Sequence, residues 1–160
     1  MQRLVRSANR LVDGLAIATF TGMFLCVFAQ VVSRYGFDRP LVWSDELARY
    51  LFVWCAFLGW IVAARRRSHL AVDVVSMNVG QRGRAALALV GAIVALVFAV
   101  VLFAYGIQIT RRNADIETVA LFFTFGVVYA IVPAASLAVA LYAIADAKSA
   151  LRALVEKDAR

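Results

Sequence analysis

The densest group of polar and charged side chains lies in the segment WSDELARY at residues 43–50. Asp45 and Arg49 are four residues apart, so on a helix they can form an ion pair on one face. Glu46 is three residues before Arg49 and four before Tyr50, so its carboxylate can reach either side chain. These spacings predict an anchored helix start and leave open a role of the same groups in binding a partner subunit.

The first residues of this segment fit a helix that begins at a membrane surface. Ser44 is a suitable N-cap, and the acidic pair that follows it favours the positive end of the helix dipole. Trp43 suits the headgroup level of a bilayer, where amphipathic aromatic rings are common. A catalytic pair of carboxylates is not supported, because no other reactive group is near in sequence.

Two further polar groups flank apolar stretches. Arginines at 65–67 are typical of a stop-transfer segment beside anionic lipid. His69 lies four residues before Asp73, so the two side chains could form a hydrogen bond on a helix. A pH-sensing or metal-binding role of this single histidine is the alternative. The other group is expected to form a solvated turn or a docking surface for an extracytoplasmic protein; it comprises Arg111, Arg112, Asp115 and Glu117.

The counts of reactive residue types exclude several chemistries. The chain has two cysteines, Cys26 and Cys55, and one histidine. A disulfide framework, a four-cysteine metal site and a haem held by two histidines of this chain are therefore excluded, and we expect no cofactor. The net charge of +7 fits the basic bias of cytoplasmic loops better than nucleic-acid binding, so no nucleic-acid partner is expected.

The elements that must position these groups are predicted to be membrane helices. Of the 160 residues, 64% are hydrophobic and 17% are charged, and the mean hydropathy is +0.82, whereas soluble domains are roughly 45–50% apolar. Four apolar stretches are each long enough to cross about 30 Å of hydrocarbon as a helix. We therefore expect an all-α integral membrane protein with a single membrane domain over residues 1–160 and transmembrane helices at about 12–32, 46–65, 84–110 and 118–146. The first stretch follows a basic segment like that of a signal peptide, but it continues past the candidate cleavage site and is expected to stay uncleaved.

The distribution of lysine and arginine predicts the orientation. These residues number three before the first stretch, five between the second and third, and four after the fourth, but only two in each remaining connection. The positive-inside rule then places both termini in the cytoplasm. Between the second and third spans, the pattern over residues 70–80 predicts a short amphipathic helix in the cytoplasmic interface.

The deep part of the predicted spans contains no Asp, Glu, Lys, Arg or His. Ion-coupled carriers usually place an ionisable group at mid-membrane, so a helper subunit of a larger membrane protein is favoured. Small residues recur every fourth position in three spans, which suits close helix packing, either inside the bundle or against a partner. These stripes are Gly14, Ala18, Gly22 and Cys26; Gly91, Ala95 and Ala99; and Ala130, Ala134 and Ala138.

The segment WSDELARYLFVWCAFLGW, followed by an arginine-rich turn and HLAVDVV, resembles the signature of a transporter family. That family is the small membrane subunit, DctQ-like, of tripartite ATP-independent periplasmic (TRAP) transporters. The family pattern falls on Trp43, Asp45, Glu46, Arg49, Tyr50, Trp54, Gly59, His69 and Asp73.

The resemblance implies a role in the bacterial inner membrane. Transporters of this kind take up organic acids with a Na⁺ gradient, and a periplasmic substrate-binding protein delivers the substrate to a large multi-spanning membrane subunit. The small subunit is expected to pack beside the large one as a scaffold, to help dock the binding protein, and to bind no substrate itself. The alternatives are an autonomous small four-helix transporter and a membrane anchor subunit of a respiratory enzyme.

Overall fold

The computed structural model describes residues 2–66 and 81–158, and this part of the chain is helical with no extended strand. Four segments are long and apolar enough to cross a membrane, namely Arg6–Gly36, Val42–Arg65, Gly83–Arg112 and Phe125–Val155. The predicted all-α class with four spans is thus confirmed, whereas the predicted interfacial helix at 70–80 lies outside the described residues. The helices are α1 (Gln2–Gly36), α2 (Val42–Arg65), α4 (Gln81–Arg112), α5 (Phe125–Tyr129) and α6 (Ile131–Asp158).

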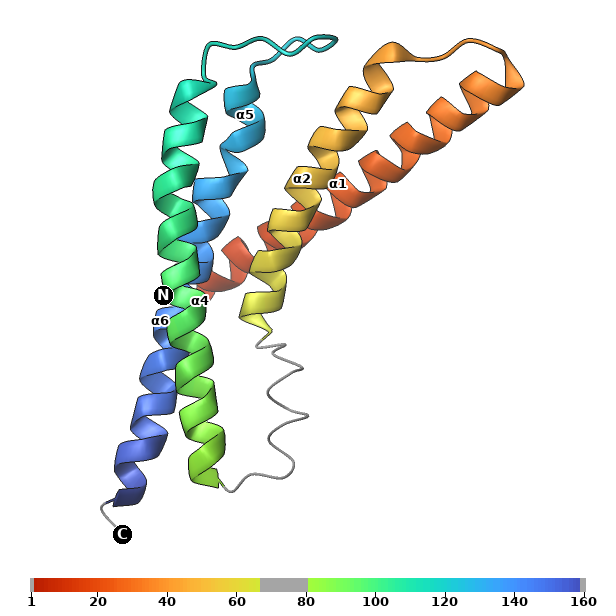
Figure 1. Cartoon of the computed structure of the whole chain (residues 1–160). Helices are drawn as coiled ribbons and strands as arrows, with labels where there is room; N and C mark the ends of the chain where they lie inside the picture. Colours follow the sequence, from red (N-terminus) through yellow and green to blue (C-terminus); the bar gives the residue numbers. More distant parts are fainter. Residues whose placement is uncertain (1, 67–80, 159–160) are drawn as a thin grey trace.

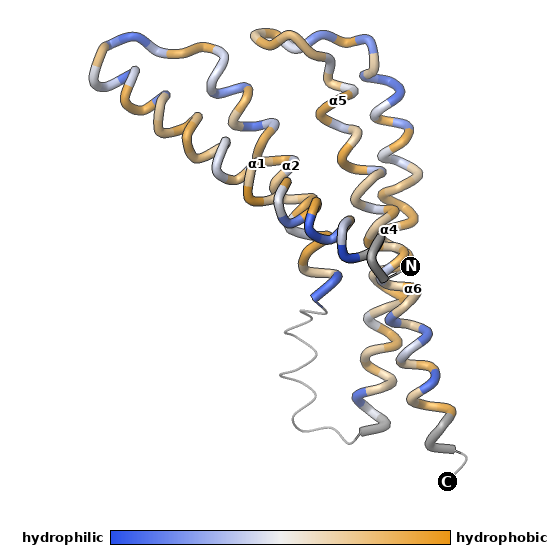
Figure 2. The backbone as a smooth tube through the Cα atoms, turned by 180° about the vertical axis from the view of Figure 1, so that it is seen from behind, coloured by the Kyte–Doolittle hydropathy of each residue, from blue (hydrophilic) through white to orange (hydrophobic). Residues whose placement is uncertain are grey.

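The long helices form two antiparallel pairs (Figure 1). One pair is α1 with α2, the other is α4 with α6, and α2 packs across onto α6. No Cα atom of α2 lies within 8 Å of a Cα atom of α4. Figure 2 shows hydrophobic residues along the middle of the long helices and hydrophilic residues toward several of their ends, while the connection before α5 is partly hydrophobic. The arrangement leaves α2 as the helix that joins the two pairs.

The buried core lies where α2, α4 and α6 meet. It consists of Leu58, Ile61, Ala99, Ile131, Ala135, Val139 and Ala140. Of the predicted small-residue stripes, the one ending at Ala99 reaches this core, and Ala99 is fully buried. The buried positions of α6 include 131, 135, 139 and 143, which lie one residue after the predicted alanine stripe, and also 136, 140 and 150; Ala130 and Ala134 of the predicted stripe are exposed. On this face Ile131 and Val139 bury more apolar area than alanine would, and the other buried residues are small.

The fourth span begins at Phe125 rather than near residue 118 as predicted. The preceding residues form a turn closed by an antiparallel bridge between Glu117 and Thr124. Thr118 explains the difference, because its hydroxyl lies 2.9 Å from the Leu121 carbonyl oxygen and 2.8 Å from that of Phe123. Such a side chain offers the backbone an alternative to the helical hydrogen-bond pattern.

The fourth span is also interrupted at residue 130, between α5 and α6. Pro133 has no backbone N–H, so the carbonyl of Tyr129 lacks its helical donor four residues later. The helix is therefore interrupted within the turn before this proline, although Ala130 keeps helical backbone angles and bonds to the Gly126 carbonyl oxygen. The other three spans are longer than predicted at their polar ends; α1, for example, extends over Gln2–Gly36 rather than 12–32.

Candidate functional site

Glu46, in the second turn of α2, holds the loop between α4 and α5. Its Oε1 accepts a hydrogen bond from the Tyr50 hydroxyl and one of 3.1 Å from the backbone N–H of Val119. Its Oε2 accepts one of 2.7 Å from the backbone N–H of Ala120. Hydrogen bonds to an ionised acceptor are roughly twice as strong as neutral ones. We call Glu46, Tyr50, Val119 and Ala120 the Glu46 cluster.

Tyr50 packs beneath the same loop. Its side chain is buried, and its ring makes edge contacts with Phe123 at 5.9 Å and Phe125 at 5.8 Å between ring centroids. Of the two partners that spacing allows Glu46, the structure therefore uses Tyr50, and in the described residues no ion pair joins Glu46 to Arg49. Glu46 and Tyr50 face the interior of this chain and serve its own loop.

The loop is also fixed from its far side. A Cβ at Gly126 would lie 2.8 Å from the Cα of Ala114. The backbones at positions 114 and 126 can therefore approach this closely only because residue 126 is glycine. The loop carries two fully projecting apolar side chains, Val119 and Phe122, with exposures of 91% and 104%. The predicted docking residues are all exposed at this end of the molecule, namely Arg111 and Arg112 in the last turn of α4 and Asp115 and Glu117 in the loop.

Asp45 and Arg49 lie on the opposite, exposed face of α2. Within the described part of the chain they form no ion pair with each other, contrary to the pairing that their spacing allows. Gly59 lies on the same face, with nothing within 4 Å of where a Cβ would be. The exposed positions of this helix recur at heptad-like spacing, and we call them the α2 outer face: Asp45, Arg49, Phe52, Ala56, Gly59 and Ala63.

The remaining predicted residues divide between surface and interior. Trp43 is 42% exposed beside the α2 outer face, whereas Trp54 packs against the buried core. His69 and Asp73 lie outside the described residues. The structure thus separates the predicted group, placing Glu46, Tyr50 and Trp54 inward and Asp45, Arg49 and Gly59 outward.

The start of α2 is fixed by Gln30 of α1 rather than by Ser44. The N-cap position is Leu41, which has no side-chain cap. The Gln30 side-chain oxygen accepts hydrogen bonds from the Leu41 N–H at 3.1 Å and from the Ser44 hydroxyl at 2.5 Å. The prediction that Ser44 caps the helix is therefore wrong, because Ser44 lies inside the first turn and its hydroxyl is within hydrogen-bond distance of the Gln30 side-chain oxygen and of the Leu41 carbonyl oxygen.

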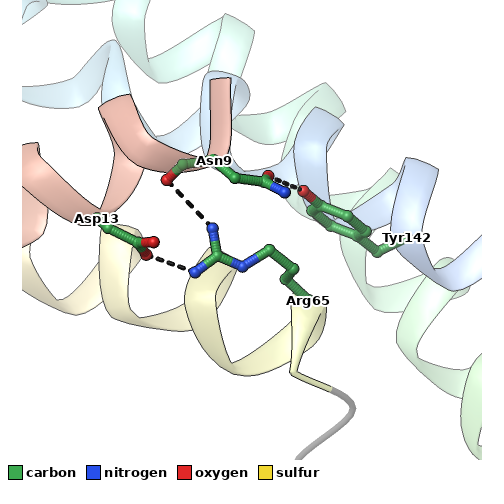
Figure 3. Close-up of polar contacts among 4 residues, drawn as sticks. All are labelled: Asn9, Asp13, Arg65 and Tyr142. Atoms are coloured by element: carbon green, nitrogen blue, oxygen red, sulfur yellow. Dashed lines mark hydrogen bonds and ion pairs between the residues drawn. The ribbon is translucent and has the colours of Figure 1, made fainter. Parts of the chain in front are cut away.

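A second polar group lies at the other end of α2 (Figure 3). Arg65 donates to the backbone oxygen of Asn9 at 3.1 Å and forms an ion pair with Asp13. The side-chain oxygen of Asn9 accepts a hydrogen bond of 2.9 Å from the hydroxyl of Tyr142. We call these four residues the Arg65 cluster. It joins α1, α2 and α6, and the sequence pattern did not predict it, although the i, i+4 spacing of Asn9 and Asp13 places both on one face of α1.

Together, the four apolar spans and the polar groups at their ends define a small helical integral membrane protein. Residues 23–153 match the model of the family described as tripartite ATP-independent periplasmic transporters, DctQ component. The chain belongs to this family. It is accordingly a multi-pass bacterial inner-membrane protein of a transport family, as the resemblance of residues 43–75 predicts.

Curated relatives agree with this assignment. The chain is 36% identical to a TRAP transporter small permease protein of Haemophilus influenzae, over 54% of each chain, so it spans about half the length of that relative. It is 26% identical to the sialic acid TRAP transporter small permease protein SiaQ of Vibrio cholerae, over 76% of this chain and 70% of that one. It is also 40% identical to part of the sialic acid TRAP transporter permease protein SiaT of Haemophilus influenzae, over 42% of this chain and 11% of that protein.

Proposed function

We propose that this chain is the small scaffold subunit of a Na⁺-coupled, binding-protein-dependent TRAP transporter for organic acids, such as dicarboxylates, keto acids or sugar acids. In this role it binds no substrate, packs against a large multi-spanning membrane subunit, and has both termini in the cytoplasm. Its similarity to a short part of SiaT, a much longer permease protein, supports a function beside a larger permease portion.

The α2 outer face is the observation that carries this proposal. It presents Asp45 and Arg49, which form no ion pair with each other, above a row of small residues that includes Gly59 and Ala63. Small residues let helix backbones approach closely in a bilayer, where van der Waals packing and interhelical hydrogen bonds drive association. This face therefore suits a helix of the large subunit with polar groups near the membrane surface.

A scaffold role also accounts for the position of the ionisable groups. Between Arg49 and Arg65 of α2, and between Arg84 and Arg111 of α4, there is no Asp, Glu, Lys, Arg or His. Carriers that move ions or acids normally hold such groups inside the membrane. We therefore assign substrate and Na⁺ binding to the large subunit.

The α4–α5 loop is the surface that we propose to contact the periplasmic binding protein. Arg111, Asp115 and Glu117 are exposed there, and the Glu46 cluster fixes the backbone that carries the projecting Phe122 side chain. Charged and projecting apolar groups on a fixed loop can provide both orientation and a buried anchor for a protein partner.

The proposal is tested by recovering the tagged chain from native membranes in mild detergent and identifying the proteins that accompany it. A stoichiometric large multi-spanning subunit is expected. Gly59→Leu, which adds bulk to the α2 outer face, should remove that subunit, whereas Gly91→Leu should retain it, because Gly91 of α4 also has nothing within 4 Å. Recovery of the native chain alone would contradict the proposal and favour an autonomous transporter.

A further inference from the structure

A groove of about 450 Å³ lies between α2 and α4, whose Cα atoms stay more than 8 Å apart. Its walls are apolar, formed by Val53 and Phe57 of α2, Leu102 and Ile109 of α4, and Val132 at the start of α6. The polar side chains lining it come mainly from the last two turns of α4 and include Gln108 and Arg112.

The groove extends over one leaflet of a bilayer. Leu102 and Arg112 are ten residues apart on α4, which corresponds to about 15 Å along the helix axis. That length is half of the roughly 30 Å hydrocarbon thickness. Arg112 is the last residue of its membrane span, so the groove runs from the headgroup level toward the middle of the membrane.

Aromatic side chains close the inner end of the groove. Phe57 contacts Trp60 with ring centroids 6.3 Å apart, and Trp60 contacts Phe98 of α4 at 5.8 Å. The second of these contacts joins α2 to α4 below the groove. The groove therefore ends in a wall of aromatic side chains.

Arg112 places a positive charge at the outer end of the groove. Its exposed guanidinium has no hydrogen bond or ion pair with any other residue in the described ranges. A guanidinium offers a planar set of donors that matches phosphate, and its charge persists at any physiological pH. The apolar groove is as long as one leaflet and suits an acyl chain of a phospholipid. The guanidinium at its membrane-surface end suits the phosphate of the headgroup.

We propose that this groove binds one glycerophospholipid, with an acyl chain along Val53, Leu102 and Val132 and the phosphate at Arg112. An acyl chain gives the apolar walls the dispersion contacts that an empty groove would forfeit. Bound in this way, the lipid fills the space between the two helix pairs. The inference does not rest on the proposed transport role, because it concerns contacts within this chain and the bilayer.

Native mass spectrometry of the full chain in mild detergent, titrated with dioleoylphosphatidylglycerol, tests the phosphate contact. Arg112→Ala should weaken binding of the first lipid about tenfold, the change that ~1.4 kcal/mol produces. Arg111→Ala is the matched control, because this neighbouring arginine is exposed but does not line the groove, and it should leave that binding unchanged. Equal effects of the two variants would overturn the proposal.

A phosphatidylglycerol with a photoactivatable diazirine at the end of one acyl chain tests where the chain lies. In vesicles of this lipid, labelling should concentrate on peptides containing Phe57 and Leu102, and Leu102→Trp, which fills the groove, should reduce it several-fold. Uniform labelling of all lipid-facing helices would overturn the proposal. A photoactivatable residue at position 102 that cross-links to a partner protein in native membranes would also overturn the proposal. In that case a protein side chain would occupy the groove.

Discussion

The Glu46 cluster and the Arg65 cluster lie at opposite ends of α2 and hold the chain in different ways. At one end a single carboxylate accepts hydrogen bonds from the backbone of a loop that forms a turn but no helix. At the other end side chains of α1, α2 and α6 bond to one another or to a helix backbone. The first cluster fixes a surface loop, and the second ties the two helix pairs together.

This difference predicts that the two clusters affect different properties, namely the local order of the loop and the stability of the whole bundle. Leaving a backbone donor without a partner away from water costs free energy. The two loop donors that bond to Glu46 have no other acceptor in the described part of the chain, so disturbing the Glu46 cluster should change the loop more than the bundle. Disturbing the Arg65 cluster should change the stability of the whole bundle, because the contact of α1 with α6 depends on Asn9 and Tyr142.

The largest loss of stability is expected from Gly126→Val, which would displace the loop between α4 and α5. A Cβ at this position would lie 2.8 Å from the Cα of Ala114, and neither backbone can move away easily. Overpacking of this kind costs about 1–3 kcal/mol, which should appear as a lower midpoint of thermal unfolding in detergent. Gly91→Val is the control and should change the midpoint little, since that position has nothing within 4 Å.

Glu46→Ala is expected to release the loop with a smaller effect on the bundle. The backbone N–H groups of Val119 and Ala120 lose their acceptor, so their hydrogen exchange should accelerate several-fold. Asp45→Ala removes a neighbouring acid without touching the loop and should leave exchange at these two amides unchanged. Equal exchange in both variants would show that Glu46 does not hold the loop.

Arg65→Ala tests the other side of the comparison. It removes the ion pair with Asp13 and the donor to the Asn9 carbonyl. Because the Asp13 side chain is 40% exposed, we expect a loss of about 1 kcal/mol in stability, near the upper end for exposed ion pairs and below the value for buried charged hydrogen bonds. Arg66→Ala, at an exposed neighbouring position, should have no measurable effect on unfolding, and a similar loss in both variants would contradict the role of Arg65.

The smallest effect is expected from Tyr142→Phe, which deletes one hydroxyl. The lost hydrogen bond to Asn9 should lower the free energy of unfolding by about 0.5–1 kcal/mol. Tyr105→Phe is the matched control, because the Tyr105 side chain is 66% exposed. If the two variants unfold alike, the contact between α1 and α6 does not contribute to stability.

The features that could be predicted from the sequence depend on neighbours along the chain. The four spans follow from uninterrupted apolar stretches, and the contact of Glu46 with Tyr50 follows from a spacing of four residues on one helix. The fourth span was placed too early because the stretch from 118 to 124 is as apolar as a helix. There the Thr118 hydroxyl and the Glu46 carboxylate, rather than hydropathy, decide the backbone conformation.

The features that could not be predicted are assembled from distant segments. The Arg65 cluster needs three helices to meet, and the register of α6 depends on which of its faces meets α2 and α4. The bond from Gln30 to the start of α2 likewise depends on how tightly the first connection turns. For the same reason the sequence could not show which of the predicted α2 residues face inward and which face outward, because this depends on the helices that pack against α2.

Site-specific photo-cross-linking tests most directly the central claim that the α2 outer face contacts the large membrane subunit. A photoactivatable residue would replace Phe52 of the α2 outer face or Val94 of α4, whose side chains are exposed to 61% and 62%. In native membranes the probe at position 52 should form an adduct with the large subunit, and the probe at position 94 should not. An adduct at 94 without one at 52, in a complex that still assembles, would contradict the account.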